Sequence, residues 1–227
     1  MNTTIERYIN SSKYSVDNFF QDDRWLYHLK INNYQVVTII WNLFLIIVPF
    51  VICYLLIKYW QKNGFRTIGQ KLMAFLLFFF WLLFIPNTAY IISEVRHLID
   101  YCPRESKFQV CEQNAWMSLF FFTYSAIGWV TFVLLINQMK SLIKNVFGKI
   151  VANLFILVII PVIALGFLIG LLNRWNSWEL FIYPVALYKN LMLYFTVSGN
   201  LANLIIFSAF LYLLYYSGNY LFKNRIS

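Results

Sequence analysis

Four polar residues near the middle of the sequence have the types and the spacing needed for acid–base or ligand-binding chemistry. On a helix they fall within an arc of about 80°, so their side chains share one face if the helix continues beyond Pro86. A glutamate and a histidine one helical turn apart can act as general base and acid. Glu94 and His97 are therefore the candidate catalytic residues, although polar residues also occur where an apolar helix simply ends. The four residues, at intervals of three, four and three, are Asn87, Tyr90, Glu94 and His97.

A second polar group follows a later apolar segment and contains an arginine between two asparagines. Arg174 carries a planar guanidinium group, which matches the geometry of a phosphate or a carboxylate. Its alternative role is an ion pair with Glu94 or Glu179 that would hold two loops together. Trp175 and Trp178 are typical of a membrane–water interface, and two further asparagines begin the last apolar segment at a similar depth. The ligand-binding candidates are Asn87, Tyr90, Arg174, Trp175, Asn176, Trp178, Glu179, Asn200 and Asn203.

The cysteine and histidine content limits the redox and metal chemistry expected of the chain. Cys102 and Cys111 lie in one loop, where an extracytoplasmic disulfide is allowed but not required. Cys53 lies inside an apolar segment and is expected to be inert. With two histidines in the chain, a multi-histidine metal site is not expected. The sequence contains no Walker loop, nucleophile elbow, paired CxxC or HExxH motif, so it predicts no metal and leaves any cofactor unknown.

These residues are embedded in a chain that has the composition of a membrane protein. Hydrophobic residues make up 61% of it and charged residues 12%, against about half and about a quarter in soluble domains. Since lipid-exposed backbone must satisfy its hydrogen bonds internally, the apolar segments are expected to be helices. A helix needs about 20 residues to cross the hydrocarbon core. The sequence therefore predicts an all-α, polytopic transmembrane helical bundle with about five spans, over residues 36–57, 72–92, 115–137, 150–172 and 199–221.

The rest of the chain is assigned from its amphipathic pattern and its prolines. Residues 1–35 lack the apolar core of a signal peptide and are expected to form an extracytoplasmic N-terminal amphipathic segment, with a surface helix over residues 16–30. Residues 36–227 form one transmembrane domain. Residues 180–198 are interrupted by Pro184, which favours an interfacial segment over a sixth span. Three prolines inside spans should kink them, namely Pro49, Pro86 and Pro161.

The distribution of charge predicts the orientation of the chain. Nine basic residues lie in two loops and the C-terminal tail, without any acidic residue beside them. Because loops rich in lysine and arginine stay cytoplasmic, the chain is expected in the cell membrane with its N-terminus outside and its C-terminus in the cytoplasm. The net charge of +9 is then a topology signal that attracts anionic headgroups. Membrane lipids, and not nucleic acid, are the predicted partners, and a protein partner or homo-oligomer stays open. The nine residues are Lys58, Lys62, Arg66, Lys71, Lys140, Lys144, Lys149, Lys223 and Arg225.

The two polar groups together resemble the motifs of an uncharacterised, domain-of-unknown-function family of bacterial multi-pass membrane proteins. In this chain the motifs are IPNTAYIISEVRHL over residues 85–98 and RWNSWE over residues 174–179. Glu94 and Glu179 stand where the family is expected to have aspartate. Leucines 171 and 172 occupy a stretch in which the family tends to have a further arginine. The resemblance extends from about Trp41 to the C-terminus and implies the fold and topology, but no activity.

Three functions are compatible with these features. The first is a small transporter-like or accessory membrane component with an outward-facing polar site. The second is an outer-leaflet enzyme acting on a lipid-linked substrate, with Glu94 or His97 as general base and with Arg174 and Asn176 holding a headgroup. The third is a structural or interaction role, in which the polar groups fasten helix ends together. The first is our preferred hypothesis, and the sequence leaves open whether the protein is an enzyme.

Overall fold

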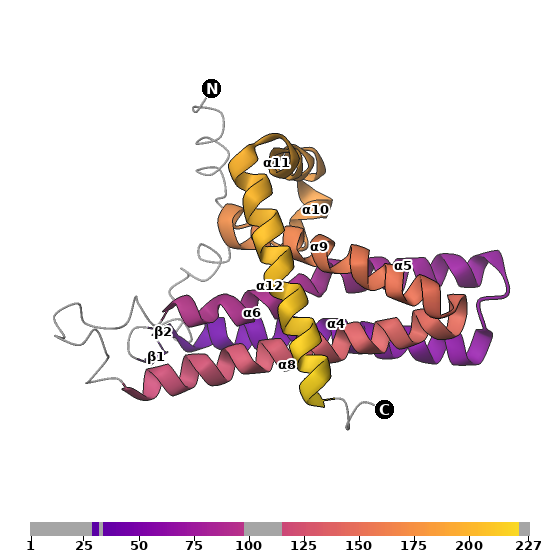
Figure 1. Ribbon diagram of the computed structural model, residues 1–227, viewed down its shortest axis with the longest axis horizontal. Helices are drawn as coiled ribbons and strands as arrows, with labels where there is room; N and C mark the ends of the chain where they lie inside the picture. Colours follow the sequence, from indigo (N-terminus) through magenta and orange to yellow (C-terminus); the bar gives the residue numbers. More distant parts are fainter. Residues whose placement is uncertain (1–28, 32–33, 98–114, 223–227) are drawn as a thin grey trace.

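The computed structural model describes residues 29–31, 34–97 and 115–222, and most of them are helical (Figure 1). Of the surface helix expected over residues 16–30, only residues 29 and 30 are described, and they are not helical. Cys102 and Cys111 lie outside the described residues. In chain order the elements are β1 (Lys30–Ile31), β2 (Tyr34–Gln35), α4 (Val36–Asn63), α5 (Ile68–Phe84), α6 (Pro86–Ile92), η1 (Ser93–Arg96), α8 (Ala115–Phe147), α9 (Lys149–Asn173), α10 (Glu179–Ile182), α11 (Pro184–Thr196) and α12 (Ser198–Phe222).

Five helical segments in the described part of the chain are long and apolar enough to cross a membrane, which confirms the predicted all-α, multi-pass fold. Each is longer than the apolar stretch expected from the sequence, because the helix continues into more polar residues. Helices α4 and α9 continue through Pro49 and Pro161, whereas the second span is interrupted at Pro86. The segments are Val36–Asn63, Ile68–Arg96, Trp116–Phe147, Lys149–Asn173 and Ser198–Phe222.

The segment before the last span forms two short helices and no sixth span. Helix α11 begins at Pro184, contains 13 residues and ends at Thr196. At 1.5 Å per residue a helix of this length reaches about 20 Å, short of the roughly 30 Å hydrocarbon core. Val197 is extended and separates α11 from α12.

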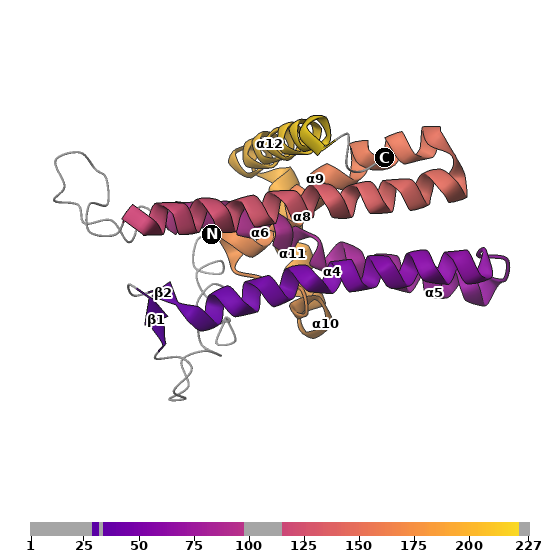
Figure 2. The same cartoon turned by 90° about the horizontal axis from the view of Figure 1, so that it is seen from below.

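The two long helical hairpins turn at the same end of the molecule. Figure 1 shows the α4–α5 turn and the α8–α9 turn at the right, whereas β2, α6 and the first turns of α8 lie at the left. Figure 2 shows α4 and α8 in separate layers, with α12 on the side of α8 that faces away from α4. We call the end with β2 and η1 the motif end. The opposite end is called the basic end because it carries Lys58, Lys62, Arg66, Lys71, Lys140, Lys144 and Lys149.

The second span breaks at Pro86, which has no amide hydrogen to continue the helical ladder. Helix α5 ends at Phe84, and α6 starts again at Pro86. The carbonyl groups released by the break must find other donors in an apolar environment. The Asn87 side chain donates to the Phe84 carbonyl at 2.9 Å, and the Thr88 hydroxyl donates to the Ile85 carbonyl at 2.8 Å.

Helix α6 is packed so closely between α8 and α9 that two glycines are needed at its contacts. A Cβ atom on Gly128 would lie 2.8 Å from the Thr88 carbonyl oxygen and 2.9 Å from the Ile92 amide nitrogen. A Cβ atom on Gly166 would lie 2.8 Å from Cγ of Pro86. The first contact is with backbone, which cannot move aside like a flexible side chain, so α6 is fixed against α8.

Replacing Gly128 with alanine should lower the melting temperature of the detergent-purified protein, because the added methyl group meets the backbone of α6. Overpacking of this kind costs about 1–3 kcal/mol. Gly69→Ala is the matched control, since nothing lies within 4 Å of a Cβ atom there and alanine favours a helix by up to about 1 kcal/mol. Equal melting temperatures for the two variants would contradict the close packing of α6 on α8.

Candidate functional site

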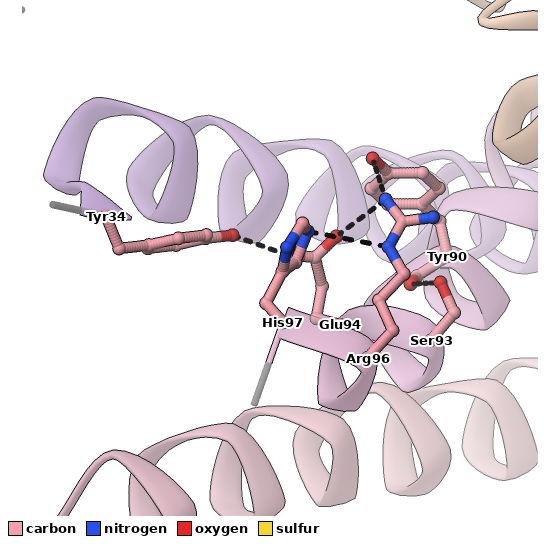
Figure 3. Close-up of polar contacts among 6 residues, drawn as sticks. All are labelled: Tyr34, Tyr90, Ser93, Glu94, Arg96 and His97. Atoms are coloured by element: carbon pink, nitrogen blue, oxygen red, sulfur yellow. Dashed lines mark hydrogen bonds and ion pairs between the residues drawn. The ribbon is translucent and has the colours of Figure 1, made fainter. Parts of the chain in front are cut away.

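The Glu94 carboxylate is buried at the motif end, and three polar side chains surround it (Figure 3). Glu94 lies in η1 and is 1% exposed. The Tyr34 hydroxyl, which comes from β2, donates a hydrogen bond to Oε2 of Glu94. Nε2 of His97 lies 3.5 Å from the same oxygen, and Nη2 of Arg96 lies 4.0 Å from Oε1. The carboxylate is therefore enclosed by groups from its own helix and from β2.

Arg96 extends this group of contacts toward α6. Its Nη2 atom donates to the Tyr90 hydroxyl at 3.3 Å, and the guanidinium carbon lies 5.6 Å from the centre of the Tyr90 ring. Its Nε atom lies 3.4 Å from Nε2 of His97. Without a proton this ring nitrogen accepts the hydrogen bond from Arg96, and with a proton it is a donor that faces Glu94. We refer to the five residues Tyr34, Tyr90, Glu94, Arg96 and His97 as the Glu94 cluster.

The contacts of Tyr34 explain how a carboxylate is tolerated in this buried position. A buried charge is unfavourable unless hydrogen bonds and opposite charges compensate for the lost hydration. Burial, and then the neighbouring Glu94 carboxylate, raise the pKa of Tyr34 above its ordinary value. The hydroxyl therefore keeps its proton and stays a donor to Glu94. The Phe121 ring packs edge-on against Tyr34 with centroids 5.3 Å apart, which holds the tyrosine in place.

The four residues of the first motif divide between two sets of contacts, because they extend along about three turns of the helix. Glu94 and His97 lie against Tyr34, whereas Asn87 and Tyr90 line a pocket. Neither candidate catalytic residue lines that pocket.

This polar pocket has a volume of about 100 Å³ and lies between α4, α6 and the segment that follows α9. Trp41 and Asn42 of α4 form part of its wall, next to residues from both sequence motifs. The pocket thus brings together six of the nine predicted ligand-binding residues. These are Asn87, Tyr90, Arg174, Trp175, Asn176 and Trp178.

Arg174 is the cationic residue of the pocket wall, and it is exposed. Among the residues that the structure describes, its guanidinium makes no hydrogen bond and no ion pair, so the alternative pairing with Glu94 or Glu179 is not formed there. Its backbone has φ 58° at the C-terminal cap of α9, a position that glycine usually occupies. Left-handed backbone costs an ordinary residue about 1–2 kcal/mol. A strained and unpaired arginine in a pocket points to ligand binding.

The Glu179 carboxylate fixes the conformation of the second motif through hydrogen bonds from Asn176. Glu179 is 5% exposed, and its Oε2 atom accepts hydrogen bonds from the backbone and the side-chain nitrogen of Asn176 at 2.6 and 3.3 Å. The Ser177 hydroxyl donates to the Leu83 carbonyl at 2.7 Å, near the break in the second span. These bonds position the loop that carries Arg174 against the end of α5.

The remaining candidates lie elsewhere. The Asn200 side chain donates to the Leu193 carbonyl at 3.3 Å and joins α12 to α11, and Asn203 does not line the pocket. Within the described ranges, no three side chains of His, Cys, Asp and Glu gather in a way that could hold a metal ion.

Sequence reasoning missed Tyr34, Asn42 and Ser177 as residues of the site. Asn42 is 8% exposed, and its amide nitrogen lies near the Tyr124 hydroxyl without forming a hydrogen bond to any described residue. A polar residue within an apolar span is expected to face protein, and this signal could have identified Asn42. Tyr34 and Ser177 bond to partners 60 and 94 residues away, and no local pattern indicates such pairs.

In the described part of the chain, five helices that are long and apolar enough to cross a membrane, together with the polar residues of the two motifs, define a multi-pass membrane protein of unknown activity. The chain belongs to the DUF1361 family, described as proteins of unknown function, whose model matches residues 41–215. No curated protein and no solved structure gives a significant match to the chain.

Tyr34→Phe should lower the melting temperature, because it removes the hydroxyl donor to Glu94 and leaves a buried carboxylate less satisfied. A hydrogen bond to a charged group contributes about 1.5–3 kcal/mol. Tyr220→Phe, at a side chain that is 81% exposed, is the matched control and should leave the melting temperature unchanged. The same small effect for both substitutions would rule out a stabilising role for the Tyr34 contact.

The stability difference between the wild type and Tyr34→Phe should decrease with rising pH in the alkaline range. Because the pKa of Tyr34 is raised in the folded state, its contribution is complete below the ordinary tyrosine pKa of about 10 and declines as the pH rises further. Melting curves of both proteins across this range measure the difference. A difference that grows above pH 10 would contradict the raised pKa.

Proposed function

We propose that this protein is a small transporter-like or accessory membrane component that holds an anionic ligand in the polar pocket. The observation that carries this proposal is the guanidinium of Arg174 on the pocket wall, which has no hydrogen bond or ion pair to any described residue. A guanidinium group donates two parallel hydrogen bonds to a phosphate or a carboxylate. The side-chain amides of Asn87 and Asn176 lie in the same wall and supply further polar contacts.

A binding role is favoured over an enzymatic one by the contacts of Glu94. The carboxylate is 1% exposed and accepts a hydrogen bond from Tyr34, and it does not line the pocket. A general base must come within hydrogen-bond reach of the proton that it removes. The same contacts give Glu94 a structural role, because they join η1 to β2.

We further propose that the pocket faces the outside of the cell membrane. The motif end carries Glu94, whereas the basic end carries lysines and an arginine without an acidic residue. Positive loops are retained in the cytoplasm. With five spans this orientation places the N-terminus outside and the C-terminus in the cytoplasm.

Reporter fusions test the orientation in a bacterial host. Green fluorescent protein fused after Ser227 should fluoresce, and alkaline phosphatase at the same position should be inactive, because the C-terminus is cytoplasmic. Fusions within the loop between η1 and α8 are the control and should give the opposite pair of results. An active phosphatase at the C-terminus would overturn the proposed orientation.

Arg174→Gly tests the binding proposal without a loss of folding, since glycine accepts φ 58° without strain. Dimethyl phosphate, a soluble phosphodiester, should raise the melting temperature of the purified wild type at constant ionic strength, as expected for a ligand of the folded state. The variant should fold with equal or higher stability and should respond at least about tenfold more weakly, because it lacks a charge-assisted contact of about 1.5–3 kcal/mol.

Arg66→Gln is the matched control for the loss of one positive charge. Arg66 is exposed at the basic end and does not line the polar pocket. This variant should respond to dimethyl phosphate like the wild type. A response of Arg174→Gly equal to that of Arg66→Gln would overturn anion binding at the pocket.

A further inference from the structure

An apolar groove of about 270 Å³ adjoins the polar pocket. Its walls come from the end of α5 and the start of α6, from the middle of α9, and from α10 and α11. Leu82, Val162 and Leu191 represent these three walls. The groove and the polar pocket are adjacent, because they share the lining residues Asn87, Tyr90, Gly170, Trp175, Asn176 and Ser177.

We infer that the anionic ligand is a membrane phospholipid with a phosphodiester headgroup, which places its phosphate at Arg174 and an acyl chain in the groove. This inference rests on the proposed anion-binding function and adds the class of the ligand. A soluble anion would use the polar pocket and leave the apolar groove without an occupant. An amphiphile fills both at once.

The charged residues that line the two cavities complement a ligand with one negative charge. Arg174 is the single cationic residue among the described residues that line either cavity, and no acidic residue lines them. A phosphodiester carries one negative charge at neutral pH, whereas a phosphate monoester carries about 1.5 to 2. One guanidinium therefore complements a phospholipid phosphodiester better than a terminal phosphate or a pyrophosphate.

The side chains at the junction of the two cavities suit a lipid headgroup region. Trp175 lines both the pocket and the groove, and tryptophan prefers the depth at which headgroups meet acyl chains. Val162 lines the groove and is 38% exposed, so the groove is open along α9. An acyl chain can therefore enter from the side, without leaving the bilayer.

The test compares a ligand that has only the phosphodiester with ligands that have both the phosphodiester and acyl chains. Melting temperatures of the purified protein in a neutral detergent are measured against dimethyl phosphate, short-chain phosphatidylglycerol and short-chain phosphatidylcholine. Phosphatidylglycerol should bind at least about tenfold more tightly than dimethyl phosphate, since burial of two methylene groups already gives a factor of this size. Phosphatidylcholine has no net charge and should bind more weakly than phosphatidylglycerol.

Val162→Trp fills the groove and leaves the polar pocket in place. It should reduce the affinity for phosphatidylglycerol to that for dimethyl phosphate and leave the dimethyl phosphate response unchanged. Val158→Trp is the matched control, because Val158 lies one turn earlier on α9, is 61% exposed and lines neither cavity. Leu187→Trp fills the same groove from α11 and should reproduce the result if Val162→Trp folds poorly.

The possible outcomes separate the two proposals. Equal affinities for phosphatidylglycerol and dimethyl phosphate, or equal behaviour of Val162→Trp and Val158→Trp, overturn the phospholipid inference and leave anion binding intact. A wild type that responds to phosphatidylglycerol but not to dimethyl phosphate, with Arg174→Gly unchanged, overturns the anion site itself. Both proposals are supported if Arg174→Gly loses the responses to dimethyl phosphate and to phosphatidylglycerol, and if Val162→Trp binds phosphatidylglycerol no more tightly than dimethyl phosphate.

Discussion

The break in the second span at Pro86 is the constraint on which the motif end of this protein depends. In an apolar environment, each carbonyl that loses its helical donor must find another one within the protein. Asn87 and Thr88 provide donors from the next turn, and Ser177 provides one from the loop after the fourth span. The break therefore also positions the loop that carries Arg174, because Ser177 of this loop bonds to the end of α5.

The polar residues gathered there divide into a closed group and an open one. In the Glu94 cluster, the carboxylate accepts a hydrogen bond from Tyr34 and lies near Arg96 and His97. These contacts suit a structural role, because they join η1 to β2. In the polar pocket, the Arg174 guanidinium has no partner among the described residues and the backbone beneath it is strained. Tyr90 belongs to both, since its hydroxyl contacts Arg96 and its side chain lines the pocket.

The sequence was sufficient to predict the spans, because apolar length and Pro184 determine which segments can cross a bilayer. It also indicated six residues of the pocket, since the polar groups that follow two of the apolar segments were expected at one depth. It could not show that Glu94 is enclosed by Tyr34 and lies outside the pocket, because the two bonded residues are 60 positions apart. Nor could it show the left-handed backbone of Arg174, where the sequence offers no glycine.

The bond between Tyr34 and Glu94 has a consequence for how the chain assembles in the bilayer. The two residues are 60 positions apart, and the whole of the first helical hairpin lies between them. During synthesis Tyr34 emerges first, so its hydroxyl stays hydrated until the second span has been threaded far enough to bring Glu94 beside it. The contact therefore cannot form before both ends of the hairpin have been synthesised, and in the folded protein it encloses a carboxylate that is 1% exposed.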